Sequence, residues 1–222
     1  EALQNAVSIQ PDFIDAIANL SALYFEISNF EDAVKGYESV IALNPSYTEA
    51  YFNLALAQEA LGEPDRALKC YSQALALDSG HLKALNNKGL ALSKKGFFSE
   101  ASDHFNSAIT LKPNFYEAYT NLGVSFSDQR KYAKALDCFH RSLEIEPEYR
   151  DALWNIALIK LRNEDFKEGF RLYEERWGVD SVKDTYIKTN KRKWNGERRK
   201  IVFVWSEQGI GDVLMFSSIL RE

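Results

Sequence analysis

Apolar residues recur three or four positions apart in successive segments of the chain, and short polar turns separate the segments. Three of these segments have their apolar positions at Ile17, Leu20 and Tyr24; at Leu85, Gly89 and Leu92; and at Tyr119, Leu122 and Phe126. This spacing places the side chains on one face of an α-helix. The pattern therefore predicts a succession of amphipathic helices joined by turns.

The helical pattern itself repeats every 34 residues. Asparagine returns at this interval five times, as Asn19, Asn53, Asn87, Asn121 and Asn155, a set termed here the asparagine ladder. Alanine (Ala33, Ala67, Ala101 and Ala135) and aromatic residues (Tyr37, Tyr71, Phe105, Phe139 and Tyr173) hold two further positions of the repeat. A small residue lets two helices approach closely, and the aromatic residue four positions later fills space on the same face. The period predicts stacked helix pairs.

Five units begin at Ile14, Thr48, Leu82, Tyr116 and Arg150. The residues before Ile14 have the pattern of a second helix that ends at Pro11, and the sequence begins with Glu1 rather than methionine. We therefore expect the chain to be a fragment of a longer protein.

These units resemble the tetratricopeptide repeat (TPR), and the resemblance extends over residues 1–176. It implies an all-α fold, a right-handed superhelix of helix pairs (a TPR solenoid), in which the first helix of each pair lines the concave groove. We expect a short β-α piece of an incomplete α/β domain to follow it.

The asparagine ladder lies on these first helices, so we expect it to line the groove. An asparagine amide offers both donors and an acceptor, and can bind the backbone of an extended peptide without selecting its side chains. The asparagine-lined groove of O-linked N-acetylglucosamine transferases is similar, and there the ladder holds substrate protein. The alternative is that asparagine is simply common at this position of the repeat and bonds to the adjacent helix.

Composition excludes several classes of protein. The 222 residues are 45% hydrophobic and 27% charged with a net charge of -5, a balance that argues against a nucleic-acid partner. No apolar run approaches the roughly 18 residues of a membrane span. Cys70 and Cys138 lie two repeats apart, too far for a disulfide, and His104 between them cannot complete a zinc site with both. We expect reduced thiols, no metal, no cofactor in this fragment and a cytoplasmic location.

The last fifth of the chain has a different pattern. Residues 177–200 form a basic linker, and Ile201–Trp205 is a continuous apolar run of the kind found in a buried strand. A turn containing Gly209 and Gly211 follows, and then an amphipathic helix. Strand, glycine turn and helix are how a Rossmann-like domain opens, with free N–H groups that can bind an anion. Residues 201–222 are therefore predicted to begin such a domain.

The segment from Lys193 to Phe216 resembles the junction between repeats and catalytic region in bacterial TPR-containing glycosyltransferases related to heptosyltransferases. Lys193-Trp194-Asn195-Gly196 and Gly211-Asp212 carry the resemblance. It implies that Asp212 is the general base acting on an acceptor hydroxyl, with a nucleotide sugar as donor of the parent protein. The alternative role of Asp212 is a helix N-cap.

Two functions follow from these patterns. The first is a TPR scaffold that binds a peptide or protein in its asparagine-lined groove. The alternative is the targeting region and first catalytic strand of a sugar transferase, inactive in this fragment. Stacking of repeats between molecules is a third interpretation. A single strand also needs a partner for its edges, so we expect a homodimer through residues 201–222 or packing of that strand against the repeats.

Overall fold

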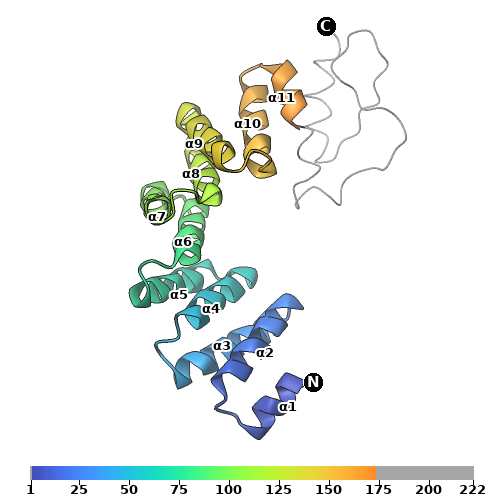
Figure 1. Ribbon diagram of the computed structural model, residues 1–222, viewed down its shortest axis with the longest axis vertical. Coiled ribbons are helices and arrows are strands. Elements are labelled where there is room, and N and C mark those ends of the chain that lie inside the picture. The colour runs from blue at the N-terminus through green and yellow to red at the C-terminus, as the bar shows by residue number, and fades with distance from the viewer. Residues whose placement is uncertain (1, 174–222) are drawn as a thin grey trace, which may run out of the picture. The chain divides into compact units, whose positions relative to one another are not determined.

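The computed structural model describes residues 2–173, and the regular structure in that range is entirely helical (Figure 1). The helices are α1 (Ala2–Ile9), α2 (Ile14–Glu26), α3 (Phe30–Leu43), α4 (Thr48–Ala60), α5 (Pro64–Leu77), α6 (Leu82–Lys94), α7 (Phe98–Leu111), α8 (Tyr116–Asp128), α9 (Tyr132–Ile145), α10 (Arg150–Arg162) and α11 (Phe166–Tyr173). The predicted all-α solenoid is confirmed. The predicted linker and β-α piece lie outside the described residues.

The chain divides into two compact units between Ile145 and Glu146. The first unit contains α1–α9 and the second contains α10 and α11. In the first unit α2 packs on α3, α4 on α5, α6 on α7 and α8 on α9, and α3, α5 and α7 also pack on the first helix of the next pair. In the second unit α10 packs on α11. Each pair therefore contacts mainly its neighbours along the chain, as expected of a repeat protein.

In two of the helix pairs an aromatic ring packs against a glycine of the partner helix. Phe105 of α7 and Phe139 of α9 are fully buried, and each ring packs against a glycine of the preceding helix. A methyl group at Gly89 would lie 2.7 Å from the Phe105 ring, and one at Gly123 would lie 2.6 Å from the Phe139 ring. These distances are shorter than van der Waals contact, so the two helix pairs require glycine at these positions.

In the pair of α2 and α3 the glycine at the close contact lies on the second helix, and the larger residue lies on the first. Ser21 stands on α2 where Gly89 and Gly123 stand on α6 and α8. Its hydroxyl donates to the Ile17 carbonyl at 2.7 Å and is buried against Gly36 of α3. A methyl group at Gly36 would collide with the Ser21 hydroxyl, so the larger residue on α2 depends on the glycine on α3.

Each helix pair closes through the same backbone turn. The residue with positive φ is Ser28, Gly62, Gly96, Arg130 or Glu164, according to the pair. In each pair the first helix ends two residues before this residue. The N–H of the residue that follows it donates to the carbonyl five residues earlier, as in Asn29 to Tyr24 at 2.8 Å and Asp165 to Lys160 at 3.0 Å. This is the hydrogen bond of a Schellman motif. Because the backbone supplies it, the turn forms even where the left-handed residue is not glycine.

His81 connects α4 to α6. Its Nδ1 accepts a hydrogen bond from the Ala84 N–H at 3.1 Å and caps α6, and its Nε2 lies 3.1 Å from the Glu49 carboxylate. Since Nδ1 accepts, Nε2 is the nitrogen that carries the proton and donates to Glu49. The imidazole also packs against the Phe52 ring, with centroids 4.9 Å apart. His81 is thus an inter-repeat residue, as its place in the turn suggests.

Two fully buried serines of the pair α8 and α9 differ in their hydrogen bonding. Ser142 accepts from the Thr120 hydroxyl at 2.9 Å, whereas the Ser125 hydroxyl has no partner among the described residues. We expect Ser125→Ala to raise the free energy of unfolding by about 1 kcal/mol, because an unsatisfied buried hydroxyl is removed. Ser142→Ala should lower it by about 1 kcal/mol, because Thr120 loses its acceptor.

Urea unfolding of both variants measures these changes. Both sites are helical and fully buried, so the change in helix propensity from serine to alanine is common to the two variants. The sign of their difference therefore reports the hydrogen bond alone. Equal losses of stability in the two variants would contradict the assignment.

Candidate functional site

The asparagine ladder occupies the sixth residue of α2, α4, α6, α8 and α10. Within the first unit Asn19 is exposed, and Asn53, Asn87 and Asn121 are half-buried. Asn155 lies on α10 in the second unit and is also half-buried. The five side chains share a position in the repeat but not an environment, and their contacts differ.

Asn87 and Asn121 are connected through a third asparagine, Asn86. The Asn121 Nδ2 donates to the Asn86 Oδ1 at 2.9 Å, and the Asn86 Nδ2 donates to the Asn87 Oδ1 at 3.4 Å. Asn86 is only 8% exposed, so this amide is held by protein partners rather than by water. The contact between Asn121 and Asn86 joins α8 to α6, and is the bond to an adjacent helix that the sequence left open as an alternative to peptide binding.

Asn155 makes a local contact instead. Its Nδ2 donates to the Asp151 carbonyl one turn earlier in α10, at 2.7 Å. A side chain that bonds to its own helix has one donor fewer for a ligand. The second unit therefore holds its ladder asparagine by a different interaction from that of Asn121.

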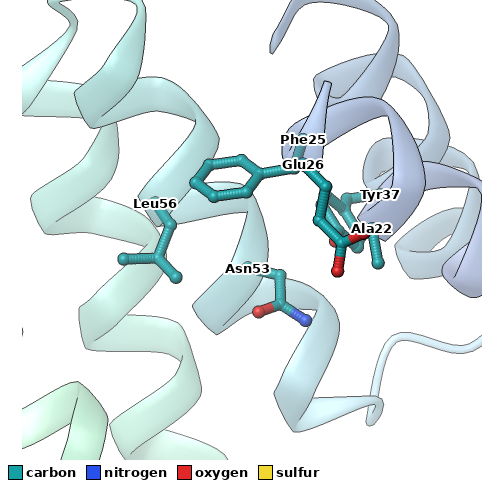
Figure 2. Close-up of a pocket in the computed structure, with 6 residues that line it drawn as sticks. All are labelled: Ala22, Phe25, Glu26, Tyr37, Asn53 and Leu56. Carbon is teal, nitrogen blue, oxygen red and sulfur yellow. The ribbon is translucent and has the colours of Figure 1, made fainter. Parts of the chain in front are cut away.

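Asn53 lines a pocket of about 170 Å³ in the first unit (Figure 2). The other lining residues are Ala22, Phe25 and Glu26 of α2, Tyr37 of α3 and Leu56 of α4. In Figure 2 the Phe25 ring reaches towards Leu56, while the Glu26 carboxylate and the Asn53 amide lie on the other side of the pocket. One wall is thus apolar, and the opposite wall carries a carboxylate and an amide.

The Tyr37 hydroxyl adds a third polar group to this pocket. Tyr37 is 2% exposed, and burial together with the negative charge of Glu26 raises its pKa to about 12. The phenol is therefore neutral at physiological pH. In the next pair, Tyr71 holds the same position, and its hydroxyl donates to the Glu59 carboxylate at 2.8 Å. Burial and Glu59 likewise raise the pKa of Tyr71.

Sequence reasoning identified Asn53 but missed the pocket around it. Tyr37 was assigned to packing alone, and Ala22, Phe25, Glu26 and Leu56 were not identified as site residues. A helical signal was available, because Glu26 follows Asn19 by two helical turns and Leu56 follows Asn53 by three residues, so each pair shares a face. The sequence pattern did not show which faces of different helices contact one another.

Other reactive side chains of the described residues do not form a site. Cys70 and Cys138 are free and half-buried, and burial raises the pKa of both thiols, that of Cys138 to about 11. The Cys70 thiol donates to the Gln58 Oε1 at 3.2 Å. Burial, and then the charge of Lys88, lowers the pKa of His104. Across residues 2–173, no three histidine, cysteine or acidic side chains are grouped so that they could hold a metal ion.

The remaining sequence-based predictions fall partly outside this part of the chain. Asp212, Gly209 and Gly211 lie outside the described residues, so the predicted general base and anion loop stay predictions. Among the described helices, none has both the length and the apolar character needed to cross a membrane.

Family models match the repeats in the register read from the sequence. A model described as "Tetratricopeptide repeat" matches residues 48–81 and 116–149, and another of that description matches residues 82–115. A model described as "TPR repeat" matches residues 22–62. Three of these matches follow one another without a gap, and together the four extend from residue 22 to residue 149, more than half of the chain.

Solved structures share the fold. PilF of Pseudomonas aeruginosa is 26% identical, with a TM-score of 0.66, over 73% of this chain and 74% of that one. PilW, a type IV pilus biogenesis factor, is 22% identical, with a TM-score of 0.68, over 78% and 81%. YrrB, "a TPR protein with an unusual peptide-binding site", is 19% identical, with a TM-score of 0.61, over 82% and 93%. No curated protein gives a significant match.

Proposed function

The chain belongs to the tetratricopeptide repeat family, and from that premise we propose that it is an interaction scaffold whose first helices bind an extended segment of another protein. The observation that carries the proposal is the pocket between α2, α3 and α4, where Asn53 presents an amide beside an apolar wall. No hydrogen bond of the Asn53 side chain is found among the described residues, in contrast to Asn121 and Asn155. Its donors and acceptor are thus open to a ligand.

The chemistry of this amide suits a peptide backbone. An extended peptide presents a C=O and an N–H along each edge, and an asparagine side chain can pair with both. YrrB, described as a TPR protein with an unusual peptide-binding site, shares the fold and supports the proposal by analogy. The groove and the participation of the other ladder residues, Asn19, Asn87, Asn121 and Asn155, remain part of the proposal.

The energy of one such contact limits what Asn53 can do alone. A hydrogen bond contributes about 0.5–1.5 kcal/mol net, whereas micromolar affinity corresponds to about 8 kcal/mol. Binding at that level needs several contacts, among them the burial of ligand side chains against Phe25 and Leu56. We therefore propose an extended ligand rather than a single amino acid.

Replacing Asn53 tests the proposal. Peptides selected from an immobilised random library by the whole chain should bind Asn53→Ala about fivefold more weakly, because one backbone contact is lost. Fluorescence anisotropy with labelled peptides measures the dissociation constants. The free energy of unfolding should change by no more than about 0.5 kcal/mol, because the side chain makes no described internal hydrogen bond.

Two further variants serve as controls for Asn53→Ala. Asn106 is exposed on the second helix α7, so Asn106→Ala should leave both binding and stability unchanged. Asn121→Ala removes the bond to Asn86 and should lower stability. The proposal fails if the library yields no ligand, or if Asn53→Ala binds the selected peptides as tightly as the unchanged chain.

A second function, sugar transfer, is proposed for the parent protein on the resemblance of residues 193–216. Glycine and aspartate at Gly211-Asp212 follow an apolar run, as in the catalytic region of heptosyltransferase-related enzymes. In that function Asp212 deprotonates the acceptor and a nucleotide sugar is the donor. Asp212→Asn in the full-length protein should abolish transfer of labelled sugar and leave peptide binding intact. Unchanged transfer would assign Asp212 to a structural role.

We also propose that residues 201–222 join two copies of the chain in a reducing, cytoplasmic compartment. An apolar strand segment supports the contact, because its edges need hydrogen-bond partners. Light scattering after gel filtration should give twice the chain mass, and removal of residues 177–222 should halve it. The mass should not depend on reductant, because Cys70 and Cys138 are free. A monomeric whole chain would contradict the contact, and a disulfide-linked dimer would contradict the compartment.

A further inference from the structure

The polar wall of the pocket carries a carboxylate, that of Glu26, for which the described residues supply no cationic partner. We propose that this pocket receives a cationic side chain, lysine or arginine, of the bound peptide and thereby sets where the peptide sits along the repeats. The inference rests on the proposed peptide binding and specifies it further. Glu26 is exposed, so its charge is accessible to a ligand entering the pocket.

The dimensions of the pocket favour a single side chain. Its volume of about 170 Å³ is below the roughly 300–1,000 Å³ of pockets that hold whole small molecules. A lysine or arginine side chain has an apolar stem and a charged end. The stem would lie along Phe25 and Leu56, and the charged end would reach the opposite wall, where Figure 2 places the Glu26 carboxylate.

Three acceptors on that wall suit a cation. The Glu26 carboxylate supplies the charge, the neutral Tyr37 phenol supplies an oxygen, and the Asn53 amide supplies a second neutral oxygen. Lys35, a basic residue of α3, is already paired with Asp32 at 2.8 Å. An anionic side chain would be repelled by Glu26, and a purely apolar one would cover the carboxylate without pairing it, which costs desolvation energy.

The combination of groups is specific to this junction in the first unit. At the next junction Ala60 stands in the place of Glu26, and at the one after it Lys94 does. The tyrosine position changes too, because Phe105 replaces Tyr37 at the third pair. The asparagine ladder repeats and would bind a peptide backbone in several registers. A cation site that occurs at one junction of the first unit selects one register within that unit. The pocket would therefore fix the register of the bound peptide, which the ladder alone does not.

The experiment compares charged side chains with neutral ones of the same shape, using the whole chain. Labelled peptides of alanine and serine carry lysine, norleucine, arginine, citrulline or glutamate at one central position, and anisotropy gives their dissociation constants. Lysine and arginine peptides should bind about fivefold more tightly than norleucine and citrulline peptides, because Glu26 is exposed and its attraction is partly screened. Glu26→Gln should remove this preference, and Glu26→Lys should transfer it to the glutamate peptide.

Control variants separate the charge from the fold and from backbone binding. Glu31→Gln changes an exposed carboxylate of α3 that does not line the pocket, and should leave the preference intact. Asn53→Ala should weaken all five peptides, and the lysine and arginine peptides most, because they lose an acceptor in the pocket as well as the backbone contact. Tyr37→Phe should reduce the preference for lysine while urea unfolding confirms that the variant is folded.

The possible results distinguish the two levels of the proposal. If no peptide binds, both the peptide-binding function and the cation pocket are overturned. If peptides bind, but lysine and norleucine bind equally, only the cation pocket is overturned. The same holds if Glu26→Gln leaves the preference unchanged or weakens every peptide alike, because Glu26 would then act elsewhere or support the fold.

Discussion

The contact between an aromatic ring on the second helix and a residue with little side chain on the first determines how closely the two helices of a pair approach. Phe139 against Gly123 and Phe105 against Gly89 leave no room for a methyl group. In such close packing, the addition of a single carbon atom disturbs the helix pair. The separation of the helices fixes the direction of the first-helix side chains, and hence which of them border the pocket. The position of Asn53 beside Glu26 and Tyr37 in this pocket is therefore a result of the packing of the pairs.

The same contact explains why the fold was predictable from the sequence and the site was not. Packing requirements recur in each pair, so they leave a 34-residue period that can be read directly. Side-chain partners do not recur in this way. Asn53 follows Phe52 and remains open to a ligand, whereas Asn121 is held by Asn86, a residue of the preceding first helix where α2 has Ala18. A ladder residue thus acquires its role from its neighbours, and a pattern based on one residue type does not record them.

Positions that repeat and positions that deviate consequently contribute differently to the structure. The residues that repeat, such as the alanines and aromatic rings of the core, build similar pairs. The residues that deviate, such as Glu26, Ala60 and Lys94 at one equivalent place, make the junctions chemically different. Both proposals for the pocket depend on this division: the repeated asparagine would hold a backbone, and the unrepeated carboxylate would choose a position along it. A residue such as Glu26 is found only by comparing units for differences.

The exchange of Ser21 and Gly36 in the pair α2 and α3 has a consequence for how such arrays can be recombined. Ser21 fits only because α3 has glycine opposite it, where the later second helices have larger residues, namely Cys70, His104, Cys138 and Leu172. A chimera that joined α2 to any of those helices would place two side chains in the same volume. With respect to this contact, α2 and α3 can be moved only together as a hairpin, whereas α2 alone cannot be combined with another second helix. For these two helices the smallest exchangeable part of the array is therefore the hairpin with its own interlocking surface.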